Sequence, residues 1–184
     1  MAVQGERRMA MLWLPTSNDF SSLTIRRARP QDARAIAEVY VDSWRETYRG
    51  KMPQAYLDSL SVPTFERHWR RTFATRGWAF VAEVDGEVVG ISSGGRCRRQ
   101  SIATGEIYVL YLLARHHGRG FGRALFDACH MELARRGMSG TLIWVLRENP
   151  ARGFYERLGG KVVCENAIKI GGASLTEVAY HWPD

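Results

Sequence analysis

A glycine-rich turn is the clearest chemical feature of the sequence. It reads His117-Gly118-Arg119-Gly120-Phe121-Gly122-Arg123 and stands between an apolar segment typical of a buried strand and a segment with helical periodicity. Glycines let a backbone come close to a ligand, and a helix N-terminus presents unpaired N–H groups with a partial positive charge. Arg115, Arg119 and Arg123 add cationic side chains around the turn. This combination favours the binding of phosphate.

Two common phosphate-binding patterns do not fit this turn. The third glycine of GRGFG does not stand at the offset that the dinucleotide pattern GxGxxG requires. No Lys-Ser/Thr pair follows as in the Walker pattern. A tight turn from strand to helix with no ligand is the alternative interpretation. The flanking arginines and the position between a strand and a helix favour phosphate binding over it.

Two periodicities of apolar residues divide the chain into strands and helices. Alternating or continuous apolar segments predict seven strands, over 23–29, 78–84, 87–94, 105–113, 141–147, 161–168 and 174–181. Helical spacing predicts five helices, from Asp32 to Gly50, over 54–60, from Pro63, over 120–136, and from Pro150 to Gly159. This order is typical of an α/β (α+β) fold, with a mixed sheet and helices on both faces.

Local signals mark the ends of these elements. Asp32 stands where a helix N-cap would, and Asp85-Gly86 is typical of a two-residue hairpin. Asn149-Pro150 supplies an N-cap and a proline at the first helical position, and Gly171-Gly172 joins the last two strands. The segment 105–113 is nearly all apolar or aromatic, so we expect a central strand that is buried on both faces.

Length and composition indicate one ordinary globular domain. The chain has 184 residues, of which 45% are hydrophobic and 24% are charged, and no apolar run approaches the roughly 18–20 residues of a membrane span. We expect residues 1–22 to form a flexible N-terminal extension and residues 23–184 to form the domain. Three cysteines, Cys97, Cys129 and Cys164, show no metal-ligand spacing, which favours reduced thiols, a cytoplasmic location and no bound metal.

The net charge of +7 favours an anionic partner. Nucleic acid, a membrane surface and a polyphosphorylated small molecule all satisfy it. Three arginines and two histidines fall within residues 115–123, around the glycine turn, and this placement favours the small molecule. The basic run Arg96–Arg99 motivates nucleic-acid binding, but the sequence has no helix-turn-helix, zinc-finger or RNA-recognition signature.

Three motifs together resemble the GNAT superfamily of N-acetyltransferases. The turn, preceded by LYLLARH and followed by RALF, is similar to the acetyl-CoA-binding motif of that superfamily. The opening TIRRARPQDARAIAEVY resembles its first strand and helix, and Asn149 to Gly159 resembles its Asn-x-x-Ala-x-x-Phe-Tyr-Glu helix. The resemblance covers residues 23–182. His117 stands where Gln or Arg is usual, Ala114 replaces a common proline, and Gly160 replaces an aromatic residue.

The resemblance implies a GNAT-like mixed, mostly antiparallel central sheet of about seven strands, flanked by about four to five helices. It also implies acetyl-CoA as co-substrate. Backbone amides would bind the coenzyme phosphates at His117, Gly118, Arg119, Gly120, Phe121, Gly122 and Arg123. The pantetheine arm would run along Leu112, Leu113 and Ala114, where the N–H of Leu112 polarises the thioester carbonyl. Asn149 would bind the pantetheine region, and a simple N-cap is its alternative role.

Tyr155 is the general acid that the resemblance implies. A phenol with a pKa of about 10 suits the protonation of a leaving thiolate whose pKa is about 8.5. A core aromatic at helical spacing is the alternative. The six-residue spacing from Asn149 to Tyr155 favours catalysis.

Glu106 is the first candidate for the general base, either directly or through a water molecule. Glu83 on a neighbouring strand is the second, and a solvated strand-end carboxylate is the alternative for both. His116 is a weaker candidate because it adjoins the phosphate turn. The resemblance implies direct attack by the amine, so neither Cys97 nor Cys129 is needed as an acyl carrier.

The resemblance implies an acceptor site near the first two helices, their connection and the last strands. Trp44, Tyr48 and Tyr56 would line it, and Glu46 and Glu83 would attract a cationic amine. A buried aromatic stripe with surface charges is the alternative. We expect a polyamine or another small primary amine, ahead of a protein N-terminus or lysine.

The sequence also allows expectations about a non-catalytic role, about partners and about oligomeric state. A non-catalytic acyl-CoA-binding sensor is the main competing hypothesis, and the presence of Asn149, Tyr155 and Glu106 argues against it. Partners are expected to include no nucleic acid and no membrane. A homodimer is compatible with the sequence.

Overall fold

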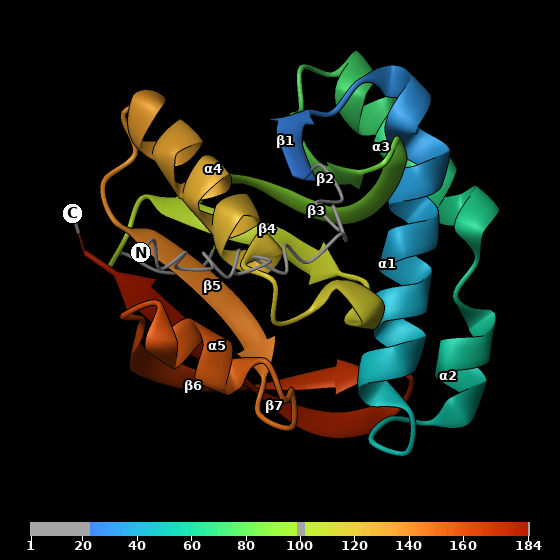
Figure 1. Cartoon of the computed structure of the whole chain (residues 1–184). Helices are drawn as coiled ribbons and strands as arrows, with labels where there is room; N and C mark the ends of the chain where they lie inside the picture. The colour runs from blue at the N-terminus through green and yellow to red at the C-terminus, as the bar shows by residue number, and fades with distance from the viewer. Residues whose placement is uncertain (1–22, 99–101, 184) are drawn as a thin grey trace, which may run out of the picture.

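The computed structural model describes residues 23–98 and 102–183 (Figure 1). The expected N-terminal extension, residues 1–22, lies outside the described residues. The strands are β1 (Leu23–Arg27), β2 (Phe80–Val84), β3 (Glu87–Arg96), β4 (Gly105–Leu112), β5 (Thr141–Leu146), β6 (Lys161–Ile170) and β7 (Ala173–Trp182). The α-helices are α1 (Ala33–Tyr48), α2 (Gln54–Ser59), α3 (Val62–Ala74), α4 (Phe121–Arg135) and α5 (Arg152–Arg157).

The described strands form one sheet in the order β1-β2-β3-β4-β5-β7-β6. Neighbouring strands are antiparallel except for the central pair β4 and β5, which is parallel. Helices α1, α2 and α3 lie on one side of the sheet, and α4 and α5 lie on the other (Figure 1). The expected mixed, mostly antiparallel sheet of seven strands with five helices is confirmed.

Strands β4 and β5 are paired over a short length only. Gly105, Glu106 and Ile107 face Thr141, Leu142 and Ile143, and beyond this point the two strands diverge. The expectation that 105–113 is buried on both faces is therefore wrong in part. Gly105–Ile107 are buried, whereas Tyr108 is 38% exposed and the side chains from Val109 to Leu112 are partly buried where the strands open.

A β-bulge lies where the opening begins. Val109 pairs with Ser93 and Ile107 pairs with Gly94, so Tyr108 is the extra residue on β4. A Cβ at Gly94 would lie 2.5 Å from the carbonyl oxygen of Glu106, and one at Gly95 would lie 2.7 Å from the Tyr108 hydroxyl. The glycine pair in β3 thus allows the close approach of the bulged strand, and the bulge re-aims the side chains that follow.

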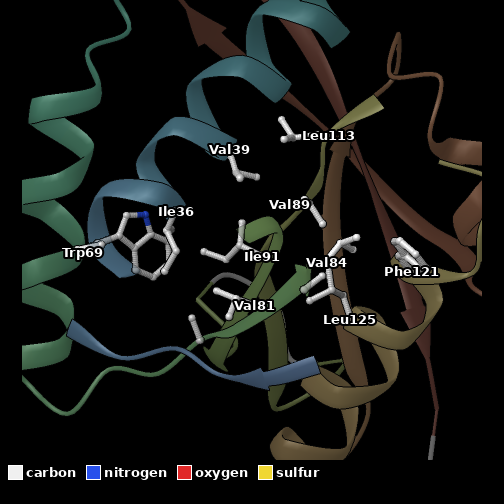
Figure 2. Close-up of a cluster of buried hydrophobic side chains, with 13 residues drawn as sticks. Ile36, Val39, Trp69, Val81, Val84, Val89, Ile91, Leu113, Phe121 and Leu125 are labelled. Atoms are coloured by element: carbon white, nitrogen blue, oxygen red, sulfur yellow. The ribbon is translucent and has the colours of Figure 1, made fainter. Parts of the chain in front are cut away.

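The largest core cluster joins the glycine turn to the sheet. Figure 2 shows Leu113, Phe121 and Leu125 near Val84 and Val89 of the sheet. These five side chains are at most 6% exposed. Ile36 and Val39 of α1 and Trp69 of α3 belong to the same cluster. The start of α4 is therefore held by core packing on the C-terminal side of the turn.

The local signals in the sequence have mixed outcomes. Asp85 and Gly86 both have positive φ, 52° and 84°, as a type I′ hairpin requires. Asp32 stands at the N-cap position of α1 as predicted, but its side chain makes no capping hydrogen bond there. Its carboxylate instead accepts hydrogen bonds from the Arg29 backbone N–H at 2.6 Å and from the Arg26 side chain at 2.8 Å. The hydrogen bond from Arg26 lowers the pKa of Asp32.

Within residues 23–98 and 102–183, no helix is long and apolar enough to cross a membrane. In the same residues, no group of three or more His, Cys, Asp or Glu side chains is placed to hold a metal ion.

A buried carboxylate ties the C-terminal half of α4 to β1. Glu132 is 5% exposed and accepts hydrogen bonds from Arg27 of β1 and from Arg135 and Arg136 near its own helix end. These bonds, with that from Arg135 the strongest, hold the pKa of Glu132 well below its ordinary value. This ion pair fixes the orientation of the helix that begins at the glycine turn.

We predict that Glu132→Gln lowers the free energy of unfolding by about 1–3 kcal/mol at neutral pH, because three charge-assisted hydrogen bonds lose their anion. A carboxyl whose pKa is lowered by folding stabilises the folded state above its unfolded pKa of about 4.3. That contribution falls as the pH drops toward the folded value. Denaturant unfolding at pH 7 and pH 3 should show a smaller difference between variant and wild type at the lower pH.

Glu38→Gln is the matched control, because Glu38 forms an exposed pair with Arg34 on the surface of α1. We expect it to change the free energy of unfolding by less than about 0.5 kcal/mol at either pH. A Glu132→Gln effect of the same size at both pH values would contradict the ionic origin.

Candidate functional site

The opening between β4 and β5 leads into a cavity of about 260 Å³. Its walls come from α1, from β4 and β5, from β6 and β7, and from the segment that begins α5. Strand divergence provides this space, because backbone that would otherwise be covered by a neighbouring strand faces a void. The cavity thus lies at the one parallel pair of the sheet.

One face of α1 supplies the aromatic wall. Tyr40, Ser43, Trp44, Thr47 and Tyr48 follow the helical repeat and all line the cavity. The Trp44 Nε1–H donates to the Tyr111 hydroxyl of β4 at 2.8 Å, and the Tyr40 and Tyr111 rings meet edge to face with centroids 5.1 Å apart. These contacts hold the helix against the strand and fix the shape of the wall.

Ser43 is a polar group in this wall with no partner for its hydroxyl among the described residues. The residue is only 3% exposed. Burial of a hydroxyl without a hydrogen bond costs about 1–3 kcal/mol. The cavity therefore offers an unsatisfied donor and acceptor to whatever fills it.

Asn149 and Tyr155 meet the cavity from the start of α5. The Asn149 Oδ1 accepts from the Ala151 backbone N–H at 2.8 Å, as in an Asx turn. The helix begins at Arg152 with Ala151 at its N-cap, so the prediction of Asn149 as the N-cap and Pro150 as the first helical residue is wrong. The Asn149 Nδ2 donates to the Tyr48 hydroxyl at 2.8 Å. This bond links the two sides of the cavity, α1 and the loop after β5.

Tyr155 is 6% exposed and lines the same cavity. Its ring packs against Phe154, Tyr180 and Trp182, with centroids 5.2, 5.7 and 6.2 Å away. Burial raises the pKa of Tyr155 well above the usual value of a phenol. The side chain is therefore a packed core aromatic with a protonated hydroxyl, and it lines the cavity as well. Its catalytic role stays a prediction.

Glu106 lies at the other end of the cavity and is 1% exposed. Its Oε1 accepts from Arg98 Nη2 at 2.5 Å and from Arg98 Nε at 3.2 Å, and its Oε2 accepts from the Arg98 backbone N–H at 2.9 Å. The Arg98 guanidinium also lies over the Tyr108 ring, 4.4 Å from its centroid. The expected general base is thus a buried carboxylate in contact with an internal cation.

Glu177 of β7 is a second carboxylate in the cavity wall, and the sequence interpretation missed it. It is 6% exposed, and its Oε1 accepts from the Asn166 Nδ2 of β6 at 3.2 Å. Tyr40, Ser43, Tyr111 and Arg98 were missed as well. The helical repeat from Tyr40 to Tyr48 is a signal that could have found the α1 residues, whereas no local pattern marks Glu177.

The glycine turn stands at the C-terminal end of β4. Gly118 and Gly120 have φ values of +74° and +82°, a region that favours glycine, and nothing lies within 4 Å of a Cβ added at either. The 15-residue α4 begins directly after them, so the N–H groups of its first turn face outward. His117 Nε2 lies 2.8 Å from the Leu112 carbonyl oxygen, which connects the turn to the open strand.

The backbone N–H and C=O groups of residues 112 and 113 point to opposite sides of the strand. The Leu113 N–H donates to Val89 of β3 at 3.0 Å, so the polar groups of Leu112 point the other way, toward the opening. Leu112 lines the cavity, whereas the Leu113 side chain is buried in the core. Ala114 is exposed, and its N–H donates to Glu46 at 3.4 Å.

The charged side chains around the turn have partners of their own. Arg115 pairs with Glu87 at 2.5 Å, Arg123 pairs with Asp127 at 3.7 Å, and Arg119 lies over the Phe121 ring at 4.9 Å. These contacts are at the surface and contribute little to stability, so the arginines can turn toward a bound anion. His116 is buried beside the turn and stacks on Phe121, and burial lowers its pKa.

Three predicted acceptor-site residues lie away from the cavity wall. Glu46 is exposed near Ala114, and Glu83 pairs with Arg26 of β1 at 2.6 Å, at the opposite edge of the sheet. Tyr56 packs against the turn at Gly171. Trp44 and Tyr48 do line the cavity. Cys129 is buried in α4, where burial raises its pKa to about 12, and no cysteine is among the described lining residues.

Comparison with known proteins places this arrangement in one family. The family model of the acetyltransferase (GNAT) domain matches residues 75–159. The chain is 37% identical over 163 residues to the uncharacterized N-acetyltransferase YuaI of Bacillus subtilis, covering 88% of this chain and 94% of that protein. It is 32% identical over 139 residues to an uncharacterized N-acetyltransferase of Archaeoglobus fulgidus, covering 72% of this chain and 89% of the relative.

Solved structures share the fold at lower identity. The paia N-acetyltransferase from Thermoplasma acidophilum, in complex with coenzyme A, matches with a TM-score of 0.65 and 21% identity, covering 85% of this chain and 98% of that one. The acetyltransferase yncA from Salmonella typhimurium, with acetyl-CoA, matches with a TM-score of 0.66 and 22% identity, covering 88% and 93%. Together with the close relatives, these matches show that the chain belongs to the GNAT family of N-acetyltransferases.

Proposed function

We propose that the protein transfers the acetyl group of acetyl-CoA to a primary amine of a small molecule, a polyamine or similar amine, by direct attack. One observation carries this proposal. The opening between β4 and β5 connects the glycine turn to a cavity that contains both Tyr155 and Glu106. A phosphate-binding turn, a slot for an extended arm and a pair of proton-transfer groups thus lie along one path.

The described residues fit the coenzyme. The first-turn N–H groups of α4 and the residues from His117 to Arg123 offer amide donors and cationic side chains to the phosphates. Leu112 would present its backbone to the pantetheine arm, and its N–H would polarise the thioester carbonyl. Asn149, already bonded to Tyr48, would orient the arm from the opposite side.

The chemistry then needs three proton transfers between the substrates and the side chains. The ammonium form of the acceptor gives one proton to Glu106, directly or through a water molecule, and the lone pair of the free amine attacks the thioester carbon. The new C–N bond forms as the C–S bond breaks, and the leaving thiolate takes the proton of Tyr155. The nitrogen then gives its surplus proton to the Tyr155 oxygen, and Glu106 releases its proton to solvent. Burial keeps the phenol protonated until the thiolate forms, and the same dry surroundings make the thiolate more basic, which offsets the weaker acidity of the buried phenol.

The cavity supports a small acceptor over a protein. It has a volume of about 260 Å³, an aromatic wall from α1 and β4, and the carboxylates of Glu106 and Glu177. Aromatic faces and carboxylates attract alkylammonium groups. A protein N-terminus or lysine remains the alternative acceptor. A non-catalytic acyl-CoA sensor would need neither a buried Tyr155 nor Glu106 in the cavity.

We predict thiol release from acetyl-CoA when primary alkylamines are supplied. A screen of diamines, polyamines, amino acids and lysine peptides, with free thiol as the readout, should give the highest kcat/KM for small amines that have no carboxylate. A higher kcat/KM for lysine peptides would favour the protein acceptor. Acetyl-CoA binding by calorimetry without thiol release from any acceptor would favour the sensor.

We predict that Tyr155→Phe lowers kcat by about a hundredfold or more and leaves the affinity for acetyl-CoA nearly unchanged, because only the proton donor is removed. Stopped assays of turnover and calorimetry with the coenzyme would measure the two effects. Tyr180→Phe is the matched control, since this buried neighbour bonds to Arg152 at 3.0 Å and Glu156 at 2.8 Å and is not among the lining residues. Unchanged turnover in Tyr155→Phe would remove it from the mechanism.

We predict that Glu106→Gln lowers the rate most near neutral pH, where an amine with a pKa of about 10.4 is mostly protonated. The loss should shrink as the pH rises and free amine increases. The charged or titratable groups next to Glu106 are Arg98, Tyr108 and Cys97. Glu165→Gln, which breaks an exposed pair with Arg147, is the control. A pH–rate profile that keeps the wild-type shape would exclude Glu106 as the base.

A further inference from the structure

The side chain of Arg98 lies inside the cavity, on the carboxylate proposed as the base. Its guanidinium contacts Glu106 Oε1 through two nitrogens, at 2.5 and 3.2 Å, and covers the Tyr108 ring at 4.4 Å. All three residues line the cavity. A cation of the chain itself therefore occupies this end of the candidate acceptor site.

A carboxylate beside an aromatic face is a recognition site for an organic cation. The carboxylate supplies the charge and accepts N–H hydrogen bonds, and the ring attracts the cation through its quadrupole. The guanidinium nitrogens of Arg98 stand where the N–H groups of an alkylammonium ion would make the same contacts. The occupied site thus shows what kind of group it prefers.

The Arg98 guanidinium can leave while Glu106 keeps one hydrogen-bond donor. The Arg98 side chain is 53% exposed, so solvent is within its reach. The backbone N–H of Arg98 bonds separately to Glu106 Oε2 at 2.9 Å. Departure of the side chain frees Oε1 alone. A carboxylate that is 1% exposed still needs a cation nearby, so departure is favourable when another cation takes the place.

We propose that Glu106 and Tyr108 form the subsite for the ammonium group of the acceptor, and that the Arg98 guanidinium is an internal competitor which the acceptor displaces. This inference rests on the proposed function, because the acceptor of the acetyl group is the incoming cation. The bound ammonium gives one proton to Glu106, attacks as the free amine, and gives its surplus proton to the Tyr155 oxygen once that oxygen has protonated the leaving thiolate. Internal competition reduces the apparent affinity for amines by the fraction of molecules in which Arg98 is displaced.

The opposite role for Arg98 makes the opposite prediction. If its guanidinium bound an anionic group of the acceptor, such as an amino-acid carboxylate, its removal would weaken acceptor binding. If it competes with the acceptor's ammonium, its removal strengthens binding. The sign of the change in KM therefore distinguishes the two.

The test is Arg98→Ala, assayed with 1,4-diaminobutane and with glycine as acceptors. We expect KM for the diamine to fall by roughly three- to tenfold, the range that corresponds to losing one partly exposed ion pair. Arg70→Ala is the matched control, because Arg70 pairs with Glu66 at 2.8 Å on α3 and is not among the lining residues. An unchanged or higher KM for the diamine in Arg98→Ala would overturn the proposal.

A binding measurement is independent of catalysis. Calorimetry with ethylguanidinium should show tighter binding to Arg98→Ala than to wild type or Arg70→Ala by the same roughly three- to tenfold, because the probe no longer competes with the internal guanidinium. If no acceptor releases thiol but this difference is found, the proposed function fails and the cation subsite stands. Equal binding to all three proteins would overturn the subsite.

If Arg98→Ala fails to fold, the displacement of Arg98 can be tested in the wild-type protein. A crystal structure with coenzyme A and 1,4-diaminobutane should place an ammonium nitrogen within hydrogen-bond distance of Glu106, with the Arg98 guanidinium displaced. A guanidinium that remains on Glu106 while the diamine binds elsewhere would overturn the proposal.

Discussion

The short pairing of β4 with β5 is the constraint on which the rest of the site depends. The strands share hydrogen-bonded register only from Gly105 to Ile107, and the bulge at Tyr108 then turns β4 away. Two strands that stayed paired would fill the space with backbone hydrogen bonds and leave no slot. The bulge in turn requires Gly94 and Gly95 on β3, where any side chain would collide with Glu106 or Tyr108. A pair of glycines on one strand therefore opens a cavity between two others.

The remaining elements hold the two ends of that opening. At one end, core packing of Phe121 and Leu125 fixes the start of α4, and the Glu132 ion pairs fix its far half to β1. At the other end, the aromatic wall of α1 is bonded to β4 through Trp44 and Tyr111 and to the α5 loop through Tyr48 and Asn149. Stability and function thus use the same contacts, because each bond that shapes the cavity also joins two elements of the fold.

Local motifs explain which parts of the site the sequence could predict. The glycine turn and the segment from Asn149 to Tyr155 are each a continuous stretch of sequence. The chemistry of each can therefore be inferred without knowing how the strands pair, and both flank the opening. Glu83 and Glu106 looked alike in sequence, each on a strand with apolar neighbours. Only the sheet register separates them, since Glu83 faces Arg26 at the edge strand and Glu106 faces the central opening. Glu177 joins the site through contacts between distant elements, which no local pattern encodes, whereas the helical repeat of α1 does mark Ser43.

The same reasoning explains how Glu106 would serve both the fold and the proposed reaction. A fully buried carboxylate without a partner is too costly to keep ionised, so an internal cation is needed while the cavity holds no acceptor. Arg98 meets this need with a side chain that is half exposed and a backbone N–H that bonds to the other oxygen. Under the proposed function, an incoming ammonium group would replace the guanidinium with a group of the same charge. Selectivity for cations would then follow from electrostatic balance, because a neutral or anionic ligand that displaced Arg98 would leave the buried carboxylate without a cation.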